Sequence, residues 1–498
     1  MADRIWFLIP ELILLSGAVV CAIGGLSNAA AIRRRIGFIA SVFLLASCVS
    51  IPFVYGQVHI ADSSALYPWL GKYVKFTVGI IGILLVMTSG GLMDRTYEHA
   101  IASGKDRFNA LRTSAGEYHA LLLLSITGVM LLCEANDLIW LFLALELVSL
   151  PTYVMVAMSR WSQVGQEAAM KYFFLGAISA ALMLYGFALM YGATGTFVLS
   201  DMMAAFAEQR VDGDIALFGE IGLLLAIVGL CYKIAAAPMH LYAPDVYQGA
   251  ASAVTAFLAF VPKAAGMIVI IILVSLIGWK NGLPSVIEKT LWIIAVLTMV
   301  LGNIGALLQT STKRMLGYSS IAHSGYMLIG IIAGPPLGLI AVMVYLIIYG
   351  TTNTAAFATL ASLSRDGKSI DSLDDIAGLH KRSPVAAISF SISCGSLLGI
   401  PPLFGFWGKL MLFAAGITAG HLLLVIIAAV SSAISAWYYL RLIGLTLLSP
   451  NTPRSDSVVV SLRWPFIAAL LSAIIAIGGP LALKSLTSEA KQAIVQPE

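Results

Sequence analysis

Four lysines stand inside long apolar stretches of the sequence, where a charged side chain is expensive. They are Lys171, Lys233, Lys263 and Lys409, and the acidic residue Glu146 lies in another apolar stretch. A charge at the centre of a bilayer costs at least ~2.5–3.5 kcal/mol, so such residues usually face a protein interior and have a function. A buried lysine can also give up its proton. These five residues therefore predict a path for protons.

Two histidines are further candidates for proton transfer, because imidazole titrates near neutral pH. His323 follows two serines in an apolar context, and His240 lies beside Pro238. The alternative for each histidine is a core residue that only makes hydrogen bonds.

The charged residues have alternatives as well. Glu146 needs a cation when ionised, and Lys233 is the first candidate for its partner and Lys171 the second. A static ion pair that fixes helix packing would look the same in sequence. The other lysines could extend their ammonium groups to the membrane interface. This alternative is weakest for Lys263, which lies deep in its apolar run, and strongest for Lys171, which lies near the start of its run.

The composition indicates a membrane protein built of helices. Of the 498 residues, 59% are hydrophobic and 11% are charged, and the mean hydropathy is +0.93. A soluble protein of this size cannot bury so much apolar surface. We predict an all-α polytopic membrane protein with about 14 transmembrane helices, each near the ~20 residues needed to cross a bilayer. Their approximate limits are 5–25, 36–56, 74–93, 118–133, 138–158, 168–192, 216–238, 252–276, 290–309, 316–334, 337–361, 384–415, 421–447 and 462–482.

The lysines and arginines between these stretches alternate along the chain. The loops expected on one side hold 17 of them, beginning with the cluster Arg33 to Arg35. The opposite loops and the termini hold 8, namely Arg4, Lys72, Lys75, Arg210, Lys280, Lys289, Lys484 and Lys491. Cytoplasmic loops carry the excess of basic residues, so both termini are expected outside. The polar segments near 94–117, 199–215 and 364–383 are expected to be loops.

Two of the predicted helices contain prolines and glycines in their interiors, at 229–245 and at 399–409. Proline removes a backbone donor and clashes with the preceding turn, so each helix should break there. Broken helices at membrane depth occur only around protein-lined or wet cavities. Lys233 precedes its break and Lys409 follows its own, so the two lysines are not strictly equivalent.

The broken helices are the seventh and the twelfth, five apart. A unit of five helices, being odd in number, places its second copy upside down in the membrane. We therefore expect one domain over 1–498 with an inverted repeat, in which helices 4–8 (about 118–276) correspond to helices 9–13 (about 290–447). Many transporters build a midplane site in this way.

No cofactor is expected in this chain. The cysteines form no CxxC pair and no metal-spaced cluster with histidine, and no glycine-rich nucleotide-binding run occurs. They are scattered singly, at Cys21, Cys48, Cys133, Cys231 and Cys394. The net charge of +4 is what basic cytoplasmic loops give and indicates no nucleic acid.

The stretch 233–250, which ends in the residues PDVYQGA, closely resembles the signature of the antiporter-like membrane subunits of NADH–quinone oxidoreductase, respiratory complex I. Within these, 255–264 is similar to subunit N, and 313–323 and 399–409 support the resemblance, which covers essentially the whole chain. Subunit L usually has a long lateral C-terminal helix, which this chain does not extend far enough to hold. Subunit M typically has glutamate where this chain has Lys409. Tyr242 is a mild departure, because the family often has tryptophan there.

The resemblance implies a role for each charged residue. Glu146 matches the family's acidic residue on helix 5 and Lys233 its partner on helix 7. Lys263 matches the central lysine of helix 8, and Lys409 the lysine of helix 12 near the outer exit. Lys171 matches a further lysine on helix 6.

The resemblance also implies a 14-helix fold in the membrane arm, within the bacterial inner membrane. NADH, FMN, iron–sulfur clusters and quinone would be held by partner subunits, and the neighbours would be subunit M, the small membrane subunits and lipid. The expected function is proton translocation driven by electron transfer from NADH to quinone. The alternative is a subunit of a multi-subunit cation/proton antiporter, driven by an ion gradient. A stand-alone transporter of organic solutes is disfavoured, because the sequence has no further polar cluster for a substrate.

Overall fold

The apolar stretches of the sequence fold as α-helices, because in hydrocarbon every backbone N–H and C=O must be paired within its own segment. The computed structural model describes residues 6–57, 66–90, 95–109, 112–159, 162–210, 215–279, 282–365, 368–450, 452 and 455–494. Within these ranges, 11 helices are long and apolar enough to cross a membrane. They are α4 (Ile36–Gln57), α5 (Pro68–Ser89), α7 (Ala115–Leu132), α8 (Leu138–Ser159), α9 (Gln163–Thr194), α13 (Ser252–Ile277), α14 (Ser285–Leu307), α15 (Thr312–Ala333), α16 (Leu337–Ser362), α21 (Leu422–Leu447) and α22 (Arg463–Gly478), which continues through η3 (Gly479–Ala482) into α23 (Leu483–Ala493).

Shorter apolar helices fill the remaining predicted stretches. They are α2 (Ile9–Gly25), α11 (Leu217–Lys233), α19 (Pro384–Leu398) and α20 (Phe404–Thr418). The two expected helix breaks are present, since α11 stops at Lys233 and α19 and α20 are separated by 399–403. The predicted start of the third stretch, at 74, is wrong. Pro68 occupies the first turn of α5, where a missing N–H costs nothing, so the helix begins earlier than predicted. Lys75, which the count of basic residues placed with the loops, lies well inside it.

The three segments expected to be loops contain short elements instead. They hold α6 (Arg95–Ala102), α10 (Leu199–Gln209), α17 (Leu373–Ile376), α18 (Leu379–Arg382) and strands β1 (Leu363–Arg365) and β2 (Lys368–Ser369). Strand β1 pairs antiparallel with β2 and with β3 (Val458–Val460), which gives the order β2-β1-β3. This small sheet ties the segment after α16 to the segment before α22. Two further short helices are α3 (Ala30–Arg33) and α12 (Ala243–Gly249).

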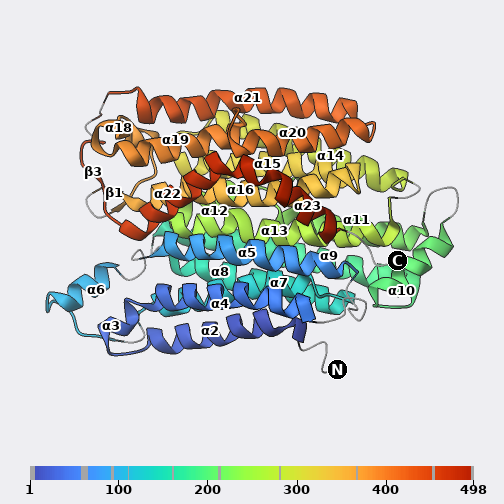
Figure 1. The fold of residues 1–498 in the computed structure, drawn as a ribbon, viewed down its shortest axis with the longest axis horizontal. Coiled ribbons are helices and arrows are strands. Elements are labelled where there is room, and N and C mark those ends of the chain that lie inside the picture. The colour runs from blue at the N-terminus through green and yellow to red at the C-terminus, as the bar shows by residue number, and fades with distance from the viewer. Residues whose placement is uncertain are drawn as a thin grey trace.

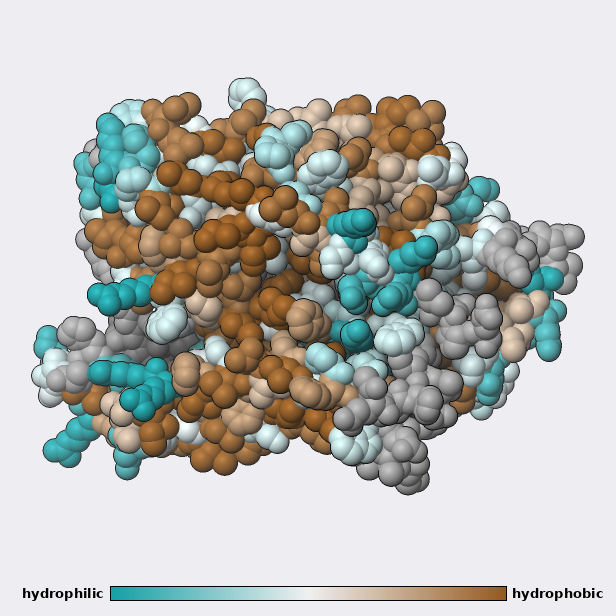
Figure 2. Space-filling view, viewed as in Figure 1, coloured by the Kyte–Doolittle hydropathy of each residue, from teal (hydrophilic) through white to brown (hydrophobic). Residues whose placement is uncertain are grey.

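The long helices lie side by side in one bundle, with α2 along one edge and α21 along the other (Figure 1). Both chain ends lie at one end of the bundle, and α3, α6, α18 and the strands lie at the opposite end (Figure 1). Hydrophobic residues dominate the surface along the middle of the helices, and hydrophilic residues gather toward the two ends (Figure 2). Arg33 to Arg35 thus lie away from the termini, as the alternation of basic residues predicts. Arg4 and Lys280 lie outside the described residues.

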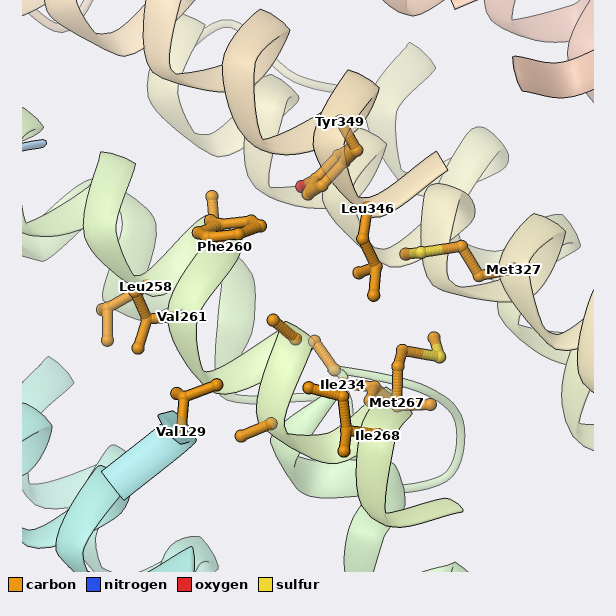
Figure 3. Close-up of a cluster of buried hydrophobic side chains, with 14 of the residues drawn as sticks. Val129, Ile234, Leu258, Phe260, Val261, Met267, Ile268, Met327, Leu346 and Tyr349 are labelled. Carbon is orange, nitrogen blue, oxygen red and sulfur yellow. The ribbon is translucent and has the colours of Figure 1, made fainter. Parts of the chain in front are cut away.

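Helix α13 forms the centre of the bundle. Every one of its residues is buried, and it contacts α5, α7, α8, α11, α15 and α16. Figure 3 shows the apolar packing on which it depends: Phe260 and Met267 of α13 lie in one cluster with Leu346 of α16 and with Ile234, directly after α11. A charged residue on α13 is therefore surrounded by protein on all sides.

Candidate functional site

The first helix break places Lys233 at the C-terminal end of a half-helix. The chain turns out of α11 through Ala235, which has a φ of +54° although it is not glycine. Such a residue costs about 1–3 kcal/mol and persists only where the surroundings enforce it. Lys233 is the last residue of α11, and the carbonyl groups exposed at a helix C-terminus favour a positive charge.

Lys233 meets the predicted carboxylate. Its Nζ lies 3.3 Å from Glu146 Oε1 and also donates a hydrogen bond to Ser149 Oγ. Glu146 and Ser149 are three residues apart on α8, so they lie on one face of that helix. Lys233 is buried, and Glu146 is only partly exposed. The structure thus brings together the first predicted pair.

Lys171 lies elsewhere, and the prediction that it could be a second partner of Glu146 is wrong. Its side chain is 43% exposed and its Nζ lies 2.6 Å from both Glu167 and Asp245. Glu167 precedes it by one turn of α9, and Asp245 on α12 also pairs with Arg314. Lys171 therefore belongs to a partly exposed ion network on the outer face of α9, and two carboxylates neutralise it there.

Lys263 lies in the middle of α13 and is buried. Its Nζ donates to the backbone carbonyl of Ser320, lies 2.8 Å from Ser320 Oγ and 3.4 Å from the hydroxyl of Tyr349. It also lies 4.5 Å from the centre of the Tyr349 ring. Its position excludes the alternative of a side chain that reaches the membrane interface. No carboxylate within the described part of the chain forms an ion pair with it.

Two serines of α15 connect the surroundings of Lys233 and Lys263. Ser324 Oγ donates to the carbonyl of Ile234, the residue after Lys233, and lies 3.3 Å from the Ser320 carbonyl that Lys263 binds. Gly266 lets α13 approach this point, because a Cβ there would overlap Ile234 and the Cβ of Lys233. Ser324 thus links the backbone just after Lys233 to the carbonyl group that holds Lys263.

His323 lies between the two halves of the site and is buried. Its Nδ1 is 2.7 Å from the Tyr345 hydroxyl and its Nε2 is 3.0 Å from the Tyr439 hydroxyl. Its ring also lies 5.2 Å from that of Tyr349, which contacts Lys263. His240, the other predicted histidine, lies between α11 and α12, and its Nδ1 has no hydrogen-bond partner among the residues described. The structure therefore joins only His323 to the lysines.

The second helix break holds Lys409. Its Nζ donates to the carbonyl of Leu398 at 2.9 Å and to Ser432 Oγ at 2.9 Å. Leu398 is the last residue of α19, so its carbonyl has no partner within that helix. The ammonium also lies 5.0 Å from the centre of the Tyr326 ring, which contacts His323 edge-on at 5.7 Å. Lys409 is buried beside the break, as the sequence predicts.

Several polar residues that contact the charged residues are not predicted from the sequence. Serines and tyrosines are common in membrane helices, and their role depends on which face of the helix they occupy. The groups missed are Ser149, Ser320, Ser324, Ser432, Tyr345, Tyr349 and Tyr439. A separate buried cation, Lys75, is also missed. The proline at the start of α5 is the signal that would have placed it inside the membrane.

Comparison with known proteins agrees with this architecture. Residues 135–435 match the family model described as NADH:quinone oxidoreductase/Mrp antiporter, TM. A chain of the Mrp complex from a Dietzia species has the same fold, with a TM-score of 0.80 at 21% identity over 99% of this chain and 97% of that chain. The bundle with its broken helices and buried lysines thus defines an antiporter-like membrane subunit.

Similarity to two further proteins assigns the chain to one family within this class. The chain is 35% identical over 87% of its length to NADH-quinone oxidoreductase subunit N of Nitrosomonas europaea, and covers 86% of it. A chain of respiratory complex I from Thermus thermophilus, solved with bound Aureothin, gives a TM-score of 0.76 and 29% identity over 96% of this chain and 99% of that chain. The chain belongs to the subunit N family of NADH–quinone oxidoreductase.

Proposed function

We propose that this chain translocates protons across the bacterial inner membrane, driven by electron transfer from NADH to quinone in partner subunits. The observation that carries the proposal is the row of three buried lysines, Lys233, Lys263 and Lys409. A serine hydroxyl contacts each of them, together with the Glu146 carboxylate at Lys233 and a backbone carbonyl at Lys263 and at Lys409. Buried ammonium groups with such ligands are costly, and membrane proteins retain them where they serve ion or proton transfer.

The proposed route runs through the two broken helices. Glu146 and Lys233 form the entry pair, and the serines of α15 lead to Lys263. His323 then connects the surroundings of Lys263 to those of Lys409, through the rings of Tyr349 and Tyr326. Lys409 is the last carrier before the outer exit. Lys171 and His240 lie off this route and have no assigned step.

The entry pair couples proton transfer in this chain to electron transfer in the redox subunits. When Lys233 is charged and lies next to Glu146, each ion compensates the other. A movement of Lys233 away from Glu146, toward the α15 serines, leaves both charges less compensated and favours the transfer of a proton. A conformational or electrostatic change that arrives from the redox subunits needs only to bias this one separation.

The scaffold we propose has 14 transmembrane helices, in which α11 with α12 and α19 with α20 count as one broken helix each. Both termini lie on the periplasmic side. The repeats at about 118–276 and 290–447 each have their break in the fourth helix of five. Corresponding pairs pack in both, since α7 contacts α8 as α14 contacts α15, and α9 contacts α11 as α16 contacts α19 and α20. These similarities support one inverted domain.

The partners in this proposal are subunit M, the small membrane subunits of the membrane arm, and lipid. NADH, FMN, the iron–sulfur clusters and quinone belong to other subunits. This chain contributes side chains that bind, orient and move protons.

The test is NADH-driven proton uptake by the purified complex in proteoliposomes, measured with a pH-sensitive dye, for Lys263→Met. We expect the complex to assemble and proton uptake per electron to fall. The matched control is Lys105→Met, an exposed lysine beyond α6. Unchanged proton uptake per electron in Lys263→Met would refute the role of the buried lysines.

The fold shared with an Mrp complex supports a second candidate, a cation/proton antiporter subunit. In that case a sodium gradient without NADH would drive proton movement that depends on Lys233. Sodium-gradient-driven proton flux in the same proteoliposomes, with quinone reduction inhibited, separates the two functions. We expect none.

A further inference from the structure

A second buried lysine cluster lies outside the proposed route, among the first helices of the chain. Lys75 on α5 has no exposed side-chain surface, and its Nζ lies 2.8 Å from Glu11 Oε1 on α2 and 2.8 Å from Glu134 Oε1 after α7. Nζ also donates to the carbonyl of Phe7 at 2.7 Å. Glu11 is in the first turn of α2, so the cluster lies toward the end of the bundle that holds both termini (Figure 1).

The charges of this cluster do not balance if both carboxylates are ionised. One ammonium and two carboxylates give +1 − 2 = −1. A buried charge without a partner is strongly disfavoured, and two carboxylates that share one site generally hold a proton between them. One bound proton would make the cluster neutral, with a single ion pair and a single carboxylic acid.

The surroundings of the two carboxyl groups differ. Glu134 Oε1 accepts a hydrogen bond from the Tyr55 hydroxyl at 2.8 Å, and its side chain is partly exposed. Glu11 is buried more completely: its Oε1 contacts the Lys75 ammonium, and its Oε2 has no hydrogen-bond partner among the described residues. Burial away from water disfavours the ionised form of a carboxyl group, so the more deeply buried Glu11 is the group that holds the proton.

The packing of α5 preserves this arrangement. Gly71 faces the cluster one turn before Lys75, and a Cβ there would overlap the Tyr55 hydroxyl and Glu134 Oε1. The titratable groups around the two carboxyl groups are Lys75, Tyr55 and Cys133, and the two carboxyl groups also act on each other.

We propose that Glu11 is a proton-binding site separate from the lysine route. Its carboxylate takes up one proton from the aqueous phase at the end of the bundle that holds the termini, with the partly exposed Glu134 as the point of access. The product is a neutral carboxylic acid next to the Lys75–Glu134 ion pair. This proposal does not rest on the proposed function, because it concerns the charge state of a cluster that the route does not include.

Infrared spectroscopy of the assembled, purified complex tests it, because a protonated carboxyl group has a carbonyl-stretch band that shifts in D₂O. We expect such a band in the natural protein and its loss in Glu11→Gln. We also expect its loss in Glu134→Gln, because Glu11 would then ionise to pair with Lys75. Glu98→Gln, at the opposite end of the molecule, is the control and should keep the band.

Identical spectra for the natural protein and Glu11→Gln would refute the site. A band that persists in Glu134→Gln would refute the charge balance from which the site is derived. If Glu11→Gln fails to assemble, Glu11→Asp provides the same test, since aspartic acid should give a band that is displaced but not lost. Absence of the band in an assembled Glu11→Asp complex would refute the proposal as well.

Discussion

The two helix breaks hold their lysines in different ways. At the first, Lys233 faces a carboxylate, Glu146 at 3.3 Å, together with Ser149. At the second, Lys409 has only neutral ligands, the carbonyl of Leu398 and the hydroxyl of Ser432. Both lysines nevertheless lie at the C-terminus of a half-helix, Lys233 as its last residue and Lys409 by reaching back to α19. Residues that are not equivalent in sequence thus occupy similar electrostatic positions.

The difference suggests a division of labour. A lysine opposite a carboxylate responds to any movement that changes their separation, which suits the point where energy enters. A lysine whose ligands are a helix-end carbonyl and a hydroxyl has no anion beside it that favours its protonated form. Such a lysine is suited to releasing a proton. Lys263 likewise has only neutral ligands, although the carbonyl that it binds, that of Ser320, lies within α15 and not at a helix end.

Removal of the lysine at the first break should have the largest effect. We expect Lys233→Ala to abolish proton pumping and strongly reduce quinone reductase activity while the complex still assembles, because Glu146 loses its cation. Dye-monitored pumping and NADH–quinone reductase assays check this, with Lys105→Ala as the control. Normal pumping by Lys233→Ala would remove the first break from the mechanism.

A carboxylate added at the second break should make it resemble the first. In Ser432→Asp, Lys409 would gain a charged partner that opposes the loss of its proton. We expect pumping to fall at least about tenfold, which corresponds to ~1.4 kcal/mol in a barrier. Ser432→Ala, which adds no charge, should be milder. Equal pumping rates in the two variants would show that neutral ligation of Lys409 is unimportant.

Removal of the carboxylate charge at the first break should make it resemble the second. We expect Glu146→Gln to lower pumping less than Glu146→Ala does, since the glutamine oxygen can still accept a hydrogen bond from Lys233. Steady-state pumping rates, with assembly verified by gel filtration, give the comparison. An equal loss in both variants would mean that the charge alone matters.

Loss of one hydroxyl between the breaks should have the smallest effect. Tyr345→Phe removes one of the two hydrogen bonds of His323 and leaves the Tyr439 contact. A hydrogen bond of this kind contributes about 1 kcal/mol, so pumping should fall by less than about fivefold. The double variant with Tyr439→Phe should fall further. If neither variant changes the pumping rate, His323 is a core residue and not a carrier.

Much of this arrangement follows from the sequence, for physical reasons. Lysines in apolar runs must be buried in protein, and prolines at 238 and 401–402 require breaks, so Lys233, Lys263, Lys409 and both interruptions are predictable. The position of Lys171 depends on the rotation of α9, which turns this lysine toward Asp245, and spacing does not reveal that rotation. Lys75 is counted with the loop residues in the sequence, because the two carboxylates that neutralise it lie far away along the chain.

The complete burial of α13 has a consequence for biogenesis. A helix with no face toward lipid cannot find its final neighbours when it leaves the ribosome, because α15 and α16 have not yet been made. Lys263 binds Ser320, which is synthesised 57 residues later. Until then Lys263 must remain in the bilayer or in the insertion machinery without this ligand. Truncated chains that end before α15 should therefore be targets of membrane quality control.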